Sequence, residues 1–223
     1  MTTHSEEQSA KHTKRVHRMP SLSMKSLLKP AVFVLLSLPF IWLVFALLTD
    51  RLGANPIEEI TDFTGEWALR ILLLSLTMTP LRMVLKKPWP IRLRRMVGLF
   101  AFFYVLTHFL TYLLLDLQLD TSAIVADIID RPYITAGSVA FIILIALAVT
   151  STNAMMRRMG KRWQSLHRLV YVATGAALLH FVWLTRGFQI EPLVYLAVFC
   201  VLMLFRTKKL MKLYLRKRSV NGT

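Results

Sequence analysis

The sequence predicts an all-α membrane protein, a bundle of six transmembrane helices with both termini in the cytoplasm. The chain of 223 residues is 55% hydrophobic and only 18% charged, with a mean hydropathy of +0.52, whereas soluble domains average about 25% charged residues. Six windows are apolar over roughly the length that a helix needs to cross about 30 Å of hydrocarbon. Basic residues gather in alternate connections between these windows, as expected for a multi-pass membrane protein.

The six windows lie near residues 31–48, 67–85, 96–118, 133–151, 163–184 and 190–206. Proline residues support three of the helix starts: Pro30 precedes the first window, Pro132 opens the fourth and Pro192 lies in the first turn of the sixth. We expect the first window to be a retained anchor, because about thirty mostly polar residues precede it, more than a signal peptide has. No internal repeat at a fixed period is evident.

These windows divide the chain into three parts. Residues 1–30 form a basic tail in the cytoplasm that we expect to be disordered, residues 31–206 form the six-helix transmembrane domain, and residues 207–223 form a second basic tail in the cytoplasm.

The distribution of charge predicts the orientation. Of the 28 Lys and Arg residues, 24 lie in the two tails and in the connections after the second and fourth windows. The positive-inside rule therefore places both termini in the cytoplasm. The acidic residues from Asp50 to Glu191 lie toward the opposite side. The net charge of +16 is thus a belt that faces lipid headgroups, and it does not indicate nucleic-acid binding.

Histidines are the candidate functional groups inside the spans. An ionisable side chain in a membrane is costly unless it is paired or liganded, so each one marks a candidate site. No Asp or Glu lies in the middle of a predicted span, which argues against a proton-coupled transporter or a cation pump. His108 lies in the third window, and His167 and His180 lie in the fifth. Imidazole ligates iron and zinc, but a zinc site favours histidines four residues apart, or a nearby Cys or carboxylate. Histidines that merely bond to a neighbouring helix are the alternative.

Depth in the membrane decides which histidines pair. His167 and His180 are thirteen residues apart, or about 20 Å along a helix, which is too far for one metal ion. His108 lies eight residues before Asp116 and His180 lies six residues before Arg186, which puts both in the outer half at nearly the same level. We therefore predict that His108 and His180 ligate one heme iron and that His167 lies apart at the cytoplasmic edge.

Four segments resemble a known family. TGEWALRILLLSLTMTPLR, RRMVGLFAFFYVLTHFLTY, RPYITAG and TSTNAMMRRMGKRWQSLHRLVY, the last followed by HFVW, are similar to MsrQ, the heme-binding membrane subunits of bacterial methionine sulfoxide reductase systems. The resemblance extends over residues 35–212, approximately. It implies an inner-membrane protein that carries heme b and FMN. It also implies that electrons pass from the quinone pool, or from a cytosolic flavin reductase, to the periplasmic molybdopterin enzyme MsrP. MsrP would reduce the methionine sulfoxide, so no catalytic residue is expected in this chain.

MsrQ in turn resembles the transmembrane domain of ferric reductases and NADPH oxidases, in which two histidines on each of two helices hold two hemes. Here the third window has only His108, and the position fourteen residues earlier is Arg94. His167 is therefore either the ligand of a second heme or part of another site. Together with Arg94 and Arg95 it would suit the phosphate of FMN, since guanidinium groups bind phosphate. The same arginines would equally suit anionic lipid headgroups.

Three functions remain open from the sequence: a heme-carrying electron conduit, a transporter or scaffold with structural histidines, and a self-sufficient quinone or ferric reductase.

Overall fold

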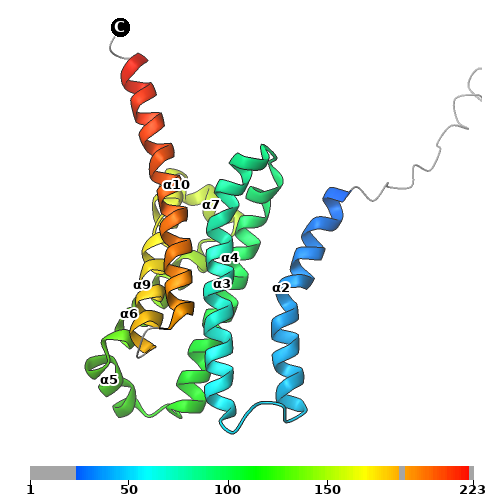
Figure 1. Cartoon of the computed structure of the whole chain (residues 1–223), viewed down its shortest axis with the longest axis vertical. Helices are drawn as coiled ribbons and strands as arrows, with labels where there is room; N and C mark the ends of the chain where they lie inside the picture. Colours follow the sequence, from blue (N-terminus) through cyan, green and yellow to red (C-terminus); the bar gives the residue numbers. More distant parts are fainter. Residues whose placement is uncertain (1–23, 186–188, 221–223) are drawn as a thin grey trace, which may run out of the picture. The chain divides into compact units, whose positions relative to one another are not determined.

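The computed structural model describes residues 24–185 and 189–220. Most of the predicted disordered tail, and Arg186, lie outside the described residues. The described chain is helical and contains no strand (Figure 1). Its elements are α2 (Met24–Leu48), α3 (Pro56–Leu85), α4 (Trp89–Thr111), the π-helix η1 (Tyr112–Asp116), α5 (Thr121–Asp130), α6 (Pro132–Val149), α7 (Asn153–Met159), α8 (Lys161–His167), α9 (Val170–Leu184) and α10 (Ile190–Val220). The described residues from Leu36 onward form one compact unit, and the candidate site lies within it.

Six helical segments are long and apolar enough to cross a membrane: Leu27–Leu48, Pro56–Leu85, Trp89–Asp116, Pro132–Val149, Lys161–Leu184 and Ile190–Thr207. This finding confirms the predicted all-α membrane protein. Large apolar side chains lie exposed along these helices, as lipid contact requires; Ile142 is 64% exposed and Leu204 is 58% exposed. The chain is a multi-pass membrane protein.

The second helix begins eleven residues before the predicted window. Asn55 caps it, its side chain accepting from the backbone N–H of Glu58, and Pro56 occupies the first helical position. Glu66 and Arg70 therefore lie well inside α3, where the sequence placed them near its outer end. The charge of Glu66 is paired, since its Oε2 lies 2.7 Å from Arg70 Nη2.

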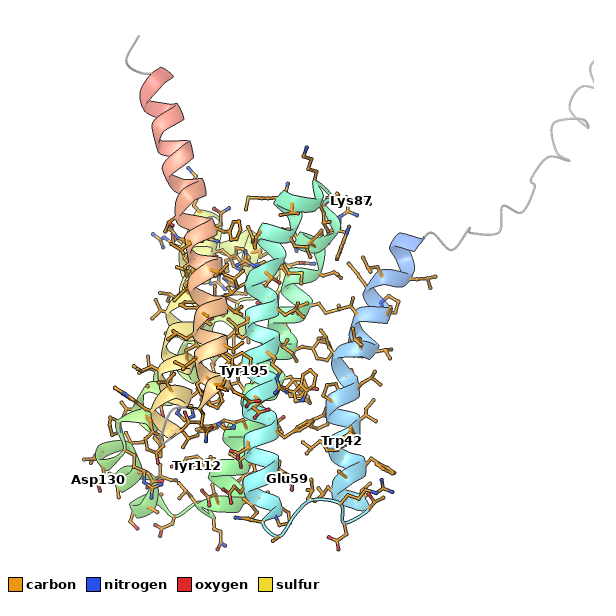
Figure 2. All side chains as sticks on the ribbon, in the orientation of Figure 1. Trp42, Glu59, Lys87, Tyr112, Asp130 and Tyr195 are labelled. Carbon is orange, nitrogen blue, oxygen red and sulfur yellow. The ribbon has the colours of Figure 1, made fainter. Side chains whose placement is uncertain are left out.

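Two helix hairpins form the centre of this unit. α3 packs along α4, and α6 packs along α9, while α10 contacts both α3 and α9. The charge differs between the two ends of the bundle. Figure 2 shows Glu59, Tyr112 and Asp130 at one end and Lys87 at the other. We name them the acidic end, with Glu58, Glu59, Asp120, Asp127 and Asp130, and the basic end, with Lys86, Lys87, Arg94, Arg95, Arg158, Lys161 and Arg162.

α5 is fastened to the acidic end. The carboxylate of Asp120 accepts from the Ser122 hydroxyl and from the backbone N–H groups of Ser122 and Ala123, and these bonds hold the pKa of Asp120 below its usual range. The cap of α5 therefore stays charged at neutral pH. The hydroxyl of Tyr112 donates to Asp127 Oδ2 at 2.8 Å, which ties α5 to η1.

Tyr104 joins α4 to the later part of α2. Its side chain is fully buried, and its hydroxyl donates to the carbonyl of Leu36 at 2.9 Å and accepts from the N–H of Phe40 at 3.0 Å. Leu36 and Phe40 are four residues apart, the spacing of one helical hydrogen bond. Pro39 lies between them and has no N–H to donate within the helix. The Tyr104 hydroxyl thus bridges a backbone pair at the proline.

Substitution Tyr104→Phe is expected to destabilise the protein by about 1–3 kcal/mol, because two backbone groups lose a partner where water is scarce. A thermal unfolding measurement in detergent checks this. Thr107→Val is the matched control: it removes a hydroxyl from the same helix that bonds only the helix's own Phe103 carbonyl. Equal losses in the two variants would contradict the bridging role.

Candidate metal centre

His108 is held in place by α3. It lies in the last turn of α4, and its Nδ1 is 2.9 Å from the carbonyl oxygen of Thr61. Gly65 lies one turn along α3, and a Cβ at that position would be 3.0 Å from Nδ1 of His108. A carbonyl only accepts, so Nδ1 carries the proton and Nε2 keeps its lone pair for a metal ion.

His180 is held by α6 in the same way. Its Nδ1 lies 2.7 Å from the carbonyl oxygen of Tyr133. Gly137 lies one turn along α6, and a Cβ there would be 3.0 Å from Nδ1 of His180. The imidazole again has Nδ1 occupied, and Nε2 is the nitrogen left for a ligand bond.

The two arrangements are related by a shift of 72 residues. The carbonyls are at 61 and 133, the glycines at 65 and 137, and the histidines at 108 and 180. The same shift carries α4 onto Lys161–Trp183, which covers α8 and nearly all of α9. It also relates three pairs of buried residues, namely Ala68 and Ala140, Leu72 and Leu144, and Ala101 and Ala173. The sequence reading missed this repeat. Each hairpin presents one imidazole from an equivalent position.

The two imidazoles face each other at a separation that suits a shared metal ion. Their ring centroids are 6.2 Å apart, with 79° between the ring planes. A metal–imidazole bond is about 2 Å long and the ring centre lies roughly 1 Å beyond the nitrogen, so two axial imidazoles are about 6 Å apart. Within the described residues, neither Nε2 makes a hydrogen bond. The structure thus brings His108 and His180 together, and their ligation of one heme iron stays a prediction.

The donor set fits a heme iron better than a bare metal ion. Among the described residues, no group of three or more His, Cys, Asp and Glu side chains is placed to hold an ion. Two imidazoles alone make an incomplete site for zinc, which takes three or four protein ligands. They are complete as the axial pair of a porphyrin iron, because the macrocycle supplies the other four nitrogens.

Aromatic contacts join the hairpins beside the two histidines. Phe109, next to His108, stacks on Phe141 of α6, with ring centroids 4.2 Å apart. On another side, Phe181, next to His180, packs against Tyr195 of α10 at 6.0 Å. Tyr195 in turn accepts from Nε of Arg70 at 2.8 Å. Arg70, which is paired with Glu66, is thus linked through Tyr195 to Phe181, the neighbour of His180.

His167 is not part of this pair and has different partners. Trp163, one turn earlier, stacks on its ring, with centroids 3.9 Å apart and 24° between the planes. Its Nδ1 lies 3.2 Å from the Trp163 carbonyl oxygen, and its Nε2 lies 3.4 Å from Oγ of Ser151. The ring is therefore held by its own helix and by a hydroxyl, and one face is covered.

The two predicted arginines lie at the same end as His167. The charge of Arg94 is close enough to act on His167, and the guanidinium of Arg95 donates to the side chain of Asn153, the first residue of α7. The shift of 72 residues places Arg95 at the position equivalent to His167, one residue from the Arg94 that the sequence suggested. Among the described residues, the basic end thus has one imidazole where the acidic end has two.

Sequence reasoning found the imidazole pair but missed what holds it. The acceptors at Thr61 and Tyr133 are backbone carbonyls, so their side chains give no signal. Gly65 and Gly137 are ordinary in appearance, because glycine is common in transmembrane helices. A comparison of the chain with itself at a shift of 72 residues would have revealed both glycines, since each lies 43 residues before its histidine.

The fold and the site together define a class: a multi-pass membrane protein in which two helix hairpins oppose two imidazoles. The family model described as the ferric reductase like transmembrane component matches residues 64–178. This stretch includes Gly65, His108 and His167 and ends two residues before His180.

Proteins with similar sequences identify the family within this class. The protein-methionine-sulfoxide reductase heme-binding subunit MsrQ of Herminiimonas arsenicoxydans is 48% identical, over 84% of this chain and 87% of its own length. The MsrQ of Polaromonas naphthalenivorans is 46% identical over 80% and 83%, and that of Rhodospirillum rubrum is 48% identical over 79% and 85%. The chain belongs to the MsrQ family. The resemblance read from the sequence segments is confirmed.

Proposed function

We propose that this chain is a heme b electron-transfer subunit that passes electrons to a methionine sulfoxide reductase. The observation that carries the proposal is the imidazole pair, with ring centroids 6.2 Å apart and both Nδ1 atoms engaged by backbone carbonyls. The names of the relatives, which describe them as heme-binding subunits, support it.

The chain's own residues bind and orient the cofactor. A bound heme supplies a one-electron carrier. His108 and His180 would hold it through Nε2, and the carbonyls of Thr61 and Tyr133 keep the proton on Nδ1, which increases the donor strength of Nε2. A site held by backbone groups on both sides reorganises little when its charge changes, which favours electron transfer over ligand exchange.

We further propose the orientation and the partners. The positive-inside rule favours a cytoplasmic location for both termini, and membership of the MsrQ family favours the bacterial inner membrane. The acidic end then faces the periplasm and the partner MsrP, in which the sulfoxide is reduced. The basic end faces the cytosol. Electrons enter from the quinone pool or from a cytosolic flavin reductase.

FMN is assigned to the basic end. The stacked pair of Trp163 and His167 offers an aromatic surface, and Arg94 and Arg95 lie at the same end of the bundle with charges that suit a phosphate. This assignment treats His167 as part of a flavin site and leaves the chain with one heme.

Transfer of electrons from the reduced chain tests the function. Anaerobic, dithionite-reduced protein freed of excess reductant is mixed with oxidised MsrP and a peptide containing methionine sulfoxide. We expect the heme to be reoxidised as methionine is formed, with neither change when MsrP is left out. A reduced heme that persists in the presence of active MsrP and substrate would contradict the partner. Reduction of the sulfoxide without MsrP would favour a self-sufficient reductase.

A further inference from the structure

We infer that Gly65 and Gly137 are positioning residues that set the orientation of the two heme ligands, so that the imidazole planes stand nearly perpendicular. The inference rests on the proposed heme site and goes beyond it, because it concerns residues that do not touch the iron. It also predicts a spectroscopic property of the bound heme that ligand identity alone does not give.

Each imidazole ring lies close to the backbone of a glycine on the neighbouring helix. At Gly65, a Cβ would lie 3.0 Å from Nδ1 and 3.1 Å from Cε1 of His108. At Gly137, a Cβ would lie 3.0 Å from Nδ1 and 3.2 Å from Cγ of His180. Real Cβ atoms rarely approach other atoms so closely, so a side chain at either glycine requires the ring to shift by a few tenths of an ångström.

This close approach lets each ring contact a backbone carbonyl. Each ring reaches a carbonyl one turn before the glycine, Thr61 at 2.9 Å and Tyr133 at 2.7 Å. The carbonyl fixes the direction of Nδ1 and the glycine fixes the face on which the ring lies. These two constraints leave an imidazole little freedom to rotate, and they recur in both hairpins.

The two rings are held with their planes nearly perpendicular. The planes of His108 and His180 are 79° apart. Perpendicular imidazoles donate π density into two different iron d orbitals, which become nearly equal in energy. A ferric low-spin heme then shows one highly anisotropic EPR line at large g. Parallel imidazoles split the two orbitals and give a rhombic spectrum with three lines. The structure therefore predicts the highly anisotropic form.

Gly175 provides a matched control. It lies on α9, five residues before His180, and a Cβ there would have no atom within 4 Å. Alanine favours a helix more than glycine does, so Gly→Ala at any of the three positions should not weaken the helix itself. A loss confined to Gly65→Ala and Gly137→Ala would then arise from the contact with the ring.

The experiment uses the full-length chain purified with heme, as wild type and as Gly65→Ala, Gly137→Ala and Gly175→Ala. Heme per chain, low-temperature EPR of the oxidised form and the midpoint potential are measured. We expect the large-g line in the wild type and in Gly175→Ala. In the other two variants we expect that line to be replaced by a rhombic or high-spin signal. The midpoint potential should rise in both, because the bond from Nδ1 to the carbonyl is weakened and the ligand becomes a poorer donor.

A rhombic wild-type spectrum would overturn the inference without any variant, and so would alanine variants at both glycines that match the wild type in EPR and potential. A variant that remains monodisperse and helical but binds no heme supports it. If one alanine variant fails to fold, the variant in the other hairpin and the wild-type spectrum decide. A wild-type chain that binds no heme at all contradicts the proposed function instead, so the two failures are distinguishable.

Discussion

Replacement of His180 by alanine is expected to abolish the b-type absorption spectrum of the purified chain, and His108→Ala is expected to do the same. Each imidazole supplies one axial bond, and among the described residues no third histidine lies at this level of the bundle. Loss of a residue that only supports a metal ligand already lowers metal affinity by about 10–100-fold. We therefore expect heme per chain to fall at least tenfold, measured by the dithionite-reduced minus oxidised spectrum.

His167→Ala is the matched control for this result. It removes an imidazole from the same membrane span, at the basic end, where the ring stacks on Trp163 at 3.9 Å and does not face a second histidine. Heme per chain should remain at the wild-type level. A His180→Ala variant with an unchanged spectrum, or a His167→Ala variant without heme, would show that the ligands have been assigned wrongly.

The second large effect is expected at the basic end. Substitution of both Arg94 and Arg95 by glutamine should lower the FMN retained per chain at least tenfold while leaving heme unchanged. A charge-assisted hydrogen bond contributes about 1.5–3 kcal/mol, and the loss of about 1.4 kcal/mol corresponds to one factor of ten in affinity. Flavin released by acid is quantified by fluorescence.

Arg92→Gln is the control for charge. Arg92 is an exposed residue on the same turn of α4, and its loss removes a positive charge without touching His167 or Asn153. FMN retention should be unaffected by this change. Equal losses from Arg92→Gln and from the double variant would indicate a general attraction to the basic end in place of a specific phosphate site.

The pairing of His108 with His180 was predictable because it depends on depth alone. Helix rise and charge positions set the level of each histidine, and a constant rise along a helix makes the count reliable. The six helices were predictable for a similar reason, since hydrocarbon thickness sets their length.

The orientation of the rings was not predictable in the same way. It depends on how α3 and α6 are rotated about their axes, and on backbone carbonyls at Thr61 and Tyr133 that have no sequence signature. The repeat was hidden because the two hairpins share few identical residues. Their equivalent positions correspond in the structure, whereas most of the residue types at these positions differ. The bridge from Tyr104 to α2 joins residues 64 and 68 positions apart in sequence, a contact that periodicity within one helix does not reveal.

The content of heme in the wild-type chain tests the central claim most directly. A pyridine hemochrome assay on purified, monodisperse protein gives heme b per chain, and the same sample gives flavin after extraction. The geometry of His108 and His180, together with the separate surroundings of His167, predicts one heme b per chain. A folded protein without heme would contradict the account, and a content of two hemes per chain would contradict the assignment of a single heme site.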